Sequence, residues 1–153
     1  MNTSLHLDPK PLIDAAREAY QHAYAPYSKY HVGAAVLCDD GRIFSGCNVE
    51  NAVYPLCICA ERVAIATAVA AGARHIVALA VVTSNGGTPC GSCRQVMREF
   101  GDPDMPVFIA DAADNTHTHI LSELLPDSFS ATDLDAAKAR GANQESGITN
   151  QES

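Results

Sequence analysis

One run of this sequence is apolar at every position. Residues 76–82 read Ile-Val-Ala-Leu-Ala-Val-Val, and an uninterrupted apolar run of this length is typical of a central strand that is covered on both faces. Such a strand needs other strands beside it and helices above and below it. The run therefore predicts a layered α/β arrangement.

The rest of the chain supplies the elements that this arrangement needs. The spacing of apolar residues predicts helices over 11–24, 59–71 and 91–100, a helical turn over 122–125 and a last helix over 133–140. Shorter apolar runs predict further strands over 32–38, 42–46, 107–110 and 117–120. Strands flanked by helices around an apolar central strand make an α/β sandwich.

Length and composition set the domain organisation. The chain has 153 residues, of which 47% are hydrophobic and 18% are charged, as in a globular protein of one domain. We expect that domain to cover residues 1–140. Residues 141–153 are polar and lack apolar periodicity, so they are predicted to form a disordered tail.

Charge and hydropathy exclude some partners. The formal net charge of −8 disfavours nucleic acid and anionic membranes, because both require a basic face. No apolar run approaches the roughly 18 residues of a membrane-spanning helix. The first residues also lack the basic start and apolar stretch of a signal peptide. We therefore expect a cytoplasmic protein without a membrane partner.

Two cysteine clusters carry the chemistry. In a reducing compartment, cysteines bind metal or catalyse more often than they form disulfides. Cys59 opens one predicted helix, and Cys90 and Cys93 open another. Helix starts favour the thiolate, and three thiolates can converge on one zinc ion and leave a fourth position for water, which is the pattern of catalytic zinc. Glu61, in the first turn beside Cys59, could exchange a proton with that water.

Two other interpretations of the cysteines stay open. Cys57 could join Cys59, Cys90 and Cys93 in a closed, structural four-thiolate site, or all four could be metal-free core residues. The spacing argues against the closed site, because structural pairs usually have about two to four residues between the cysteines. A closed site would also leave Glu61 without a chemical role, because no zinc-bound water would be present.

Taken together, the motifs resemble those of cytidine deaminases of the short-chain, homotetrameric, zinc-dependent type. The resemblance covers about residues 11–134, and the order and spacing of the motifs fit. The motifs are Ala25-Pro26-Tyr27-Ser28-Lys29-Tyr30, Val32-Gly33-Ala34-Ala35, Gly46-Cys47-Asn48-Val49-Glu50-Asn51-Ala52, Cys59-Ala60-Glu61-Arg62, Pro89-Cys90-Gly91-Ser92-Cys93-Arg94-Gln95-Val96 and Glu123-Leu124-Leu125-Pro126. The resemblance implies a three-layer α/β/α sandwich with a mixed sheet of about five strands.

The resemblance also assigns roles to residues in the metal site. It implies that Cys59, Cys90 and Cys93 bind one zinc ion per chain and that Glu61 is the catalytic proton shuttle. Arg62 follows Cys59 by about one helical turn, so it is placed to donate a hydrogen bond to a ligand sulfur and offset its charge.

The remaining roles concern the nucleoside. The resemblance implies that Asn48 and Glu50 hold the ribose hydroxyls and that the backbone at Ala60 and Thr88 meets the polar edge of the base. Phe129 would reach from a neighbouring subunit to stack on the pyrimidine. Tyr30 stands at a substrate-binding position that is usually phenylalanine, so its hydroxyl is a departure and needs a partner.

The implied reaction is the hydrolytic deamination of cytidine and 2′-deoxycytidine to uridine and 2′-deoxyuridine, with release of ammonia, as in pyrimidine salvage. The implied partners are a free pyrimidine nucleoside and three further copies of the chain, which share composite active sites. The alternatives are a structural zinc module and a related deaminase acting on blasticidin S, guanine or polynucleotide. The Asn48 and Glu50 pair favours a free ribose-bearing substrate, and the net charge disfavours polynucleotide.

Overall fold

Five strands form one mixed sheet in this computed structural model, which describes residues 7–148. The order across the sheet is β2-β1-β3-β4-β5, with β3 and β4 parallel and the other neighbours antiparallel. The strands are β1 Val32–Cys38, β2 Ile43–Cys47, β3 Ile76–Thr83, β4 Pro106–Ala110 and β5 Thr116–Ile120. The apolar run is thus the central strand, as predicted.

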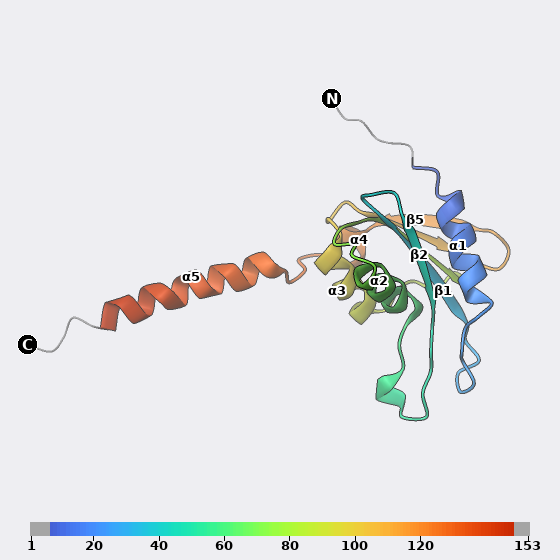
Figure 1. Ribbon diagram of the computed structural model, residues 1–153, viewed down its shortest axis with the longest axis horizontal. Helices are drawn as coiled ribbons and strands as arrows, with labels where there is room; N and C mark the ends of the chain where they lie inside the picture. The colour runs from blue at the N-terminus through green and yellow to red at the C-terminus, as the bar shows by residue number, and fades with distance from the viewer. Residues whose placement is uncertain (1–6, 149–153) are drawn as a thin grey trace, which may run out of the picture.

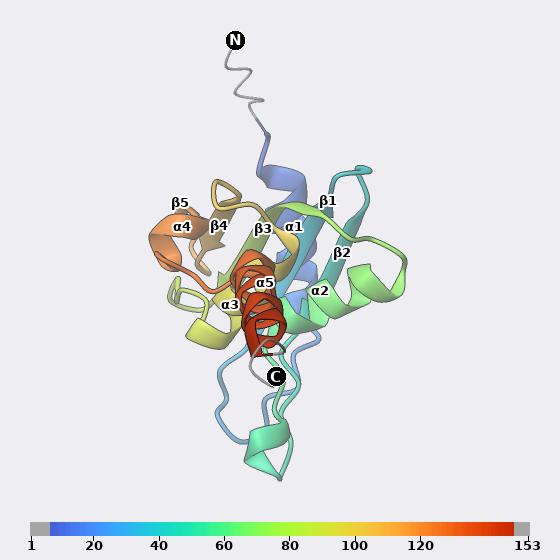
Figure 2. The ribbon, with the colours of Figure 1, turned by 90° about the vertical axis from the view of Figure 1, so that its left-hand side faces the viewer.

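Helices cover both faces of the sheet (Figures 1 and 2). On one face, α1 (Lys10–Tyr20) packs against small side chains of β1 and β3. On the other face, α2 (Ala60–Ala70) and α3 (Gly91–Phe100) enclose the larger part of the core. Alternation along β3 turns Leu79 and Val81 toward α2 and α3, and turns Val82 toward α1. The expected three-layer α/β/α sandwich with a mixed five-stranded sheet is confirmed.

Two glycines allow helices to lie very close to the sheet. A Cβ atom on Gly33 of β1 would come within 2.0 Å of the carbonyl oxygen of Ala16 in α1. A Cβ atom on Gly46 of β2 would come within 2.5 Å of the backbone nitrogen of Ala64 in α2. Neither distance leaves room for a side chain, so both contacts depend on glycine.

The first helix is shorter than the sequence predicts. It ends at Tyr20 rather than at residue 24, because the chain turns to pair with a segment far along the sequence. The Tyr24 N–H donates to the Asn48 carbonyl at 3.0 Å, and the Glu50 N–H donates to the Tyr24 carbonyl at 2.8 Å. The segment between β2 and α2 contains one short 3-10 helix, η1 (Tyr54–Leu56).

The C-terminal elements are α4 (Leu121–Leu124) and α5 (Ala131–Ile148), and α5 projects away from the sheet (Figure 1). Helix α5 continues past the expected end at residue 140 into the predicted tail. Its residues 131–141 are exposed, so alanine-rich helix propensity, and not an apolar face, accounts for it. The Ser130 N–H donates to the Asp133 carboxylate at 2.7 Å and caps the first turn.

The domain limits of 1–140 and 141–153 stay predictions, and residues 149–153 lie outside the described part of the chain. None of the helices between residues 7 and 148 is both long enough and apolar enough to cross a membrane.

Candidate active site

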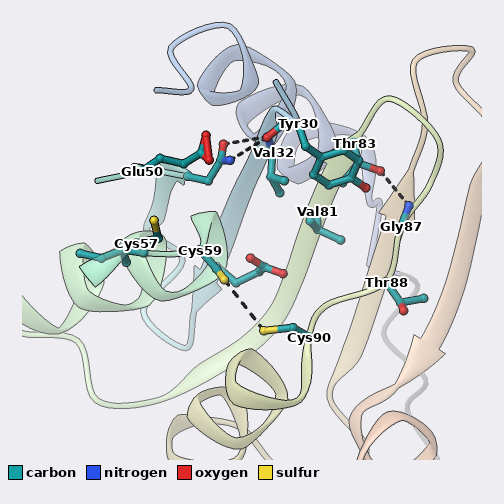
Figure 3. Close-up of a pocket in the computed structure, with 13 residues that line it drawn as sticks. Tyr30, Val32, Glu50, Cys57, Cys59, Val81, Thr83, Gly87, Thr88 and Cys90 are labelled. Atoms are coloured by element: carbon teal, nitrogen blue, oxygen red, sulfur yellow. Dashed lines mark hydrogen bonds between the residues drawn. The ribbon is translucent and has the colours of Figure 1, made fainter. Parts of the chain in front are cut away.

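Two helix starts meet beside the central strand and bring three cysteines together. Cys59 is the N-cap residue of α2, Cys90 is the N-cap residue of α3, and Cys93 lies in the first turn of α3. The Cys59 and Cys90 sulfurs are 3.9 Å apart (Figure 3), and the Cys90 and Cys93 sulfurs are 3.5 Å apart. Neither N-cap side chain caps the backbone N–H groups of its own helix, so both sulfurs can face the shared site.

This group fits a zinc ion. Sulfurs about 2.3 Å from a tetrahedral zinc lie roughly 3.8 Å from one another, and all three sulfurs lie within 4.8 Å of one another. Within the described residues 7–148, the Cys57 sulfur does not belong to this group. Its sulfur instead accepts a hydrogen bond from the Asn51 N–H at 3.3 Å. The closed four-thiolate alternative therefore lacks its fourth ligand.

The pKa values of Cys59 and Cys93 are shifted in opposite directions. Hydrogen bonding from Cys93, together with bonds from Arg62 and Cys90, lowers the pKa of Cys59 to about 5 against the opposing effect of burial. The same bond with Cys59, reinforced by burial, raises the pKa of Cys93. Cys59 thus ionises before Cys93. A metal cation deprotonates coordinating thiols outright, so zinc would turn the whole group into thiolates.

Arg62 contacts the site as the sequence predicts. Its Nη2 atom lies 3.8 Å from the Cys59 sulfur and donates to the Cys57 carbonyl at 3.3 Å. Its Nε atom is buried and has no hydrogen-bond partner. The guanidinium therefore places a positive charge beside the ligand sulfur that ionises most readily.

Glu61 is buried, with 4% of its surface exposed, and it lines the same cavity as Cys59 and Cys90. Burial raises the pKa of this carboxyl, and the charge of the Cys59 thiolate adds to the effect, although hydrogen bonds from its backbone and from Cys93 oppose it. A carboxyl in this setting is suited to accept and return a proton at near-neutral pH.

The cavity has a volume of about 270 Å³. Its wall combines the cysteine and carboxyl groups at one end with polar side chains at the other. The lining residues are Tyr30, Val32, Asn48, Glu50, Cys57, Ile58, Cys59, Glu61, Val81, Thr83, Gly87, Thr88 and Cys90. Cys93 and Ala60 are completely buried behind this wall. Ala60 opens α2, so its N–H belongs to the group that lacks a partner within the helix.

Asn48 and Glu50 are held in place by the segment before β1. The Asn48 amide accepts from the Val32 N–H at 2.9 Å and donates to the Tyr30 carbonyl at 2.8 Å. The Glu50 carboxylate accepts from the backbone N–H groups of Tyr27 and Ser28 at 3.2 and 3.1 Å. Each side chain keeps further hydrogen-bonding capacity, because an amide has two N–H donors and a carboxylate has two oxygens. This end of the cavity can therefore bind hydroxyl groups.

Thr83 and Gly87 also line the cavity, although neither was predicted from the sequence. The Gly87 N–H donates to the Thr83 hydroxyl at 2.8 Å, which folds the loop after β3 over the cavity. Thr83 carried a usable signal, because it is the first polar residue at the carboxyl end of the central strand, where open α/β sheets bind ligands.

Known proteins match the chain over most of its length. The family model of the cytidine and deoxycytidylate deaminase zinc-binding region matches residues 8–109. The chain belongs to the cytidine deaminase family. A cytidine deaminase of Sporosarcina psychrophila is 44% identical over 133 residues, covering 86% of this chain and 98% of that protein. A probable cytidine deaminase of Dictyostelium discoideum is 42% identical over 137 residues, covering 87% and 90%.

Solved structures give the same result. The crystal structure of cytidine deaminase from Burkholderia pseudomallei matches with a TM-score of 0.76 and 47% identity, and covers 80% of this chain and 100% of that one. The structure of cytidine deaminase from Mycobacterium tuberculosis matches with a TM-score of 0.70 and 41% identity, and covers 80% of this chain and 98% of that one. Membership of this zinc-binding family, together with the cysteine group, identifies zinc as the cofactor.

Of two further residues in the cytidine deaminase resemblance, Tyr30 lines the cavity and Phe129 does not. The Tyr30 hydroxyl points to the loop after β3 and donates to Asn85 at 2.8 Å, which gives the departure from phenylalanine a partner. Phe129 does not line the cavity, and 56% of its surface is exposed. Its assignment therefore stays a prediction about a neighbouring subunit.

Proposed function

We propose that this chain catalyses the hydrolytic, zinc-dependent deamination of cytidine and 2′-deoxycytidine, with release of ammonia. One observation carries the proposal. A group of three cysteines that fits a zinc ion, the buried Glu61 carboxyl, and the polar side chains of Asn48 and Glu50 meet at one small cavity. The names of the relatives support the same reaction. Uridine and 2′-deoxyuridine are the products, as in pyrimidine salvage.

The residues of the chain divide the chemical work. Cys59, Cys90 and Cys93 hold the metal, and Arg62 offsets the charge of the Cys59 thiolate. Bound zinc supplies Lewis acidity that lets a water molecule lose its proton near neutral pH. The Glu61 carboxylate accepts that proton, delivers it to N3 of the pyrimidine and later carries a proton to the amino group that leaves as ammonia.

The open end of the cavity orients the nucleoside. Asn48 and Glu50 bind the ribose hydroxyls, and the backbone at Ala60 and Thr88 binds the polar edge of the base. A ribose fixed in this way places C4 of the pyrimidine toward the cysteine group. Fixed geometry of this kind supplies a large part of the rate enhancement in many enzymes.

We also propose a cytoplasmic homotetramer with composite sites, in which Phe129 of one subunit stacks on the base in another. Support comes from exposed apolar side chains on segments beside the cavity, because exposed apolar patches mark protein interfaces. These side chains belong to Tyr24, Tyr27, Val53, Tyr54, Leu56 and Ile58. The six cysteines are all free thiols, in keeping with a reducing compartment.

An ultraviolet assay of the purified protein tests the reaction. Cytidine and 2′-deoxycytidine should be converted, whereas cytosine, which lacks the ribose, should be a poor substrate. The zinc-to-chain ratio is measured on the same sample. A protein with one zinc ion per chain that leaves both nucleosides unchanged would contradict the proposal.

A further inference from the structure

Arg94 follows the proposed zinc ligand Cys93 in α3, and its side chain bonds to two separate parts of the chain. Its Nε atom donates to the Pro89 carbonyl at 2.7 Å, and its Nη2 atom donates to the Thr88 hydroxyl at 3.1 Å. Its Nη1 atom donates to the Leu124 carbonyl at 2.7 Å. A guanidinium has five N–H donors in one rigid plane, so it can satisfy all three acceptors together.

One part held by Arg94 is the loop between β3 and α3. Thr88 lines the cavity, and Pro89 directly precedes Cys90, the N-cap residue of α3. The loop also contains Gly86, which adopts a positive φ of 71°, and Gly87, so its own backbone offers little rigidity. The side chain of Arg94 therefore fixes the segment that presents both a proposed zinc ligand and a proposed contact to the base.

The other part is the segment that leads from α4 to α5. Leu124 is the last residue of α4, and the chain then runs to Phe129 without regular structure. The next residue of α3, Gln95, donates from its side chain to the Phe129 carbonyl at 3.0 Å. Two successive residues of α3 thus hold the start and the end of the segment 124–129.

The charged Arg94 side chain donates hydrogen bonds to uncharged acceptors. All three of its acceptors are uncharged oxygens, and none of the ion pairs found among residues 7–148 includes this side chain. A charged donor strengthens each bond compared with a neutral one. The side chain is half-buried, so solvent screens these bonds less than it screens exposed contacts.

We propose that Arg94 is a positioning residue for the deamination. It holds the segment Thr88-Pro89-Cys90, which belongs to the site of its own chain, against the segment that presents Phe129 to a neighbouring site, so one side chain positions parts of two composite sites. The inference rests on the proposed function, because that function gives Thr88, Cys90 and Phe129 their roles. Lysine cannot replace arginine here, since a single ammonium cannot reach the three acceptors in one plane.

The test compares two arginines of the same helix. Arg98 lies about one turn further along α3, is also half-buried, and donates to the Gly101 carbonyl at 3.3 Å, away from the cavity. Arg94→Lys and Arg94→Ala are measured beside Arg98→Lys and Arg98→Ala as zinc-loaded, full-length proteins. The measured quantities are KM and kcat for cytidine, the rate of zinc loss to a chelator, and Tm.

Arg94→Lys should raise KM at least tenfold and speed zinc loss, because the hydrogen bonds from the charged guanidinium to the loop between β3 and α3 are lost. The Arg98 variants should stay within about twofold of the parent. The proposal is overturned if Arg94→Lys has the KM and zinc-loss rate of the parent, or if the Arg98 variants change equally. A lower Tm with unchanged KM also overturns it, because Arg94 would then serve folding alone.

Two further outcomes have a defined interpretation. If Arg94→Ala does not fold, the conservative lysine variant decides the outcome. Absence of turnover in the parent protein would contradict the proposed function, whereas a parental KM in Arg94→Lys contradicts only the role of Arg94.

Discussion

The two ends of the cavity are built differently. At the cysteine end, Cys59, Glu61 and Cys93 lie in the first turns of two helices that pack on the central sheet, and Glu61 and Cys93 are buried. At the polar end, Asn48 and Glu50 lie on an irregular segment that side-chain-to-backbone bonds attach to residues 27–32. The proposed reactive groups thus lie on helices packed against the sheet, and the groups proposed to bind the nucleoside lie on surface segments.

This contrast teaches how the two ends should respond to substitution. A change at the cysteine end removes a reacting group that no neighbour can replace, so turnover should collapse. A change at the polar end weakens one of several contacts, so the effect should be graded and should fall mainly on KM. The following four predictions test this contrast, from the largest expected effect to the smallest.

Removal of a metal ligand should have the largest effect. Cys59→Ala, Cys90→Ala and Cys93→Ala should each lose zinc and all measurable turnover, because two thiolates do not hold the ion in its tetrahedral site. Zinc-to-chain ratios measured by atomic absorption check this. Cys57→Ala is the matched control and should keep both zinc and activity. Loss of zinc from that variant would restore the four-thiolate interpretation.

Glu61→Gln should keep zinc and fold but lose several orders of magnitude in kcat. A general acid–base group contributes roughly 10²–10⁴-fold, and glutamine cannot carry a proton between water and the pyrimidine. Steady-state kinetics on zinc-loaded protein checks this. Glu99→Gln, at an exposed position of α3, serves as the control. Turnover close to that of the parent would show that Glu61 is not the proton shuttle.

Phe129→Ala should lower kcat/KM for cytidine about 5- to 150-fold. The range corresponds to the roughly 1–3 kcal/mol that stacking on a base contributes. Bound zinc should not change, because no ligand is touched. Sedimentation at micromolar concentration measures the association state independently. A fully active monomer would refute the composite site and leave the chemistry of the cysteine end intact.

Tyr30→Phe should have the smallest effect. It removes the hydroxyl that donates to Asn85 at 2.8 Å and leaves the ring in place. Because Asn85 is exposed and water can replace the lost bond, we expect a two- to fourfold rise in KM, near the low end for a neutral hydrogen bond. Asn85→Ala should give the same rise, and the double variant should add nothing further. Additive losses would contradict the coupling.

The sequence predicted the cysteine end better than the polar end. The types and spacing of Cys59, Glu61, Cys90 and Cys93 are dictated by metal chemistry and by helix starts, so local sequence was sufficient. The central strand was predictable for a similar reason, because burial on both faces leaves an uninterrupted apolar run.

Features that depend on distant pairing or on weak propensity were harder to predict. Helix α1 ends early because Tyr24 pairs with Asn48, a contact that no local pattern records. Helix α5 lacks the apolar periodicity by which helices are found, although its alanines favour one. Gly87 enters the wall only through the fold of the loop after β3, in which its N–H donates to the Thr83 hydroxyl.

Gly46 has a consequence for the range of substrates that this scaffold can acquire. It fixes the contact of β2 with α2, and a Cβ atom there would also come within 2.8 Å of Val63. Strand β2 ends at Cys47, directly before Asn48, whereas Glu61 lies in the first turn of α2, which begins at Ala60. The contact between β2 and α2 therefore sets the distance between the Glu61 carboxyl and the polar pair of Asn48 and Glu50. Longer or shorter ligands would have to be accommodated by remodelling the loops, because Gly46 has no side chain that could adjust the contact.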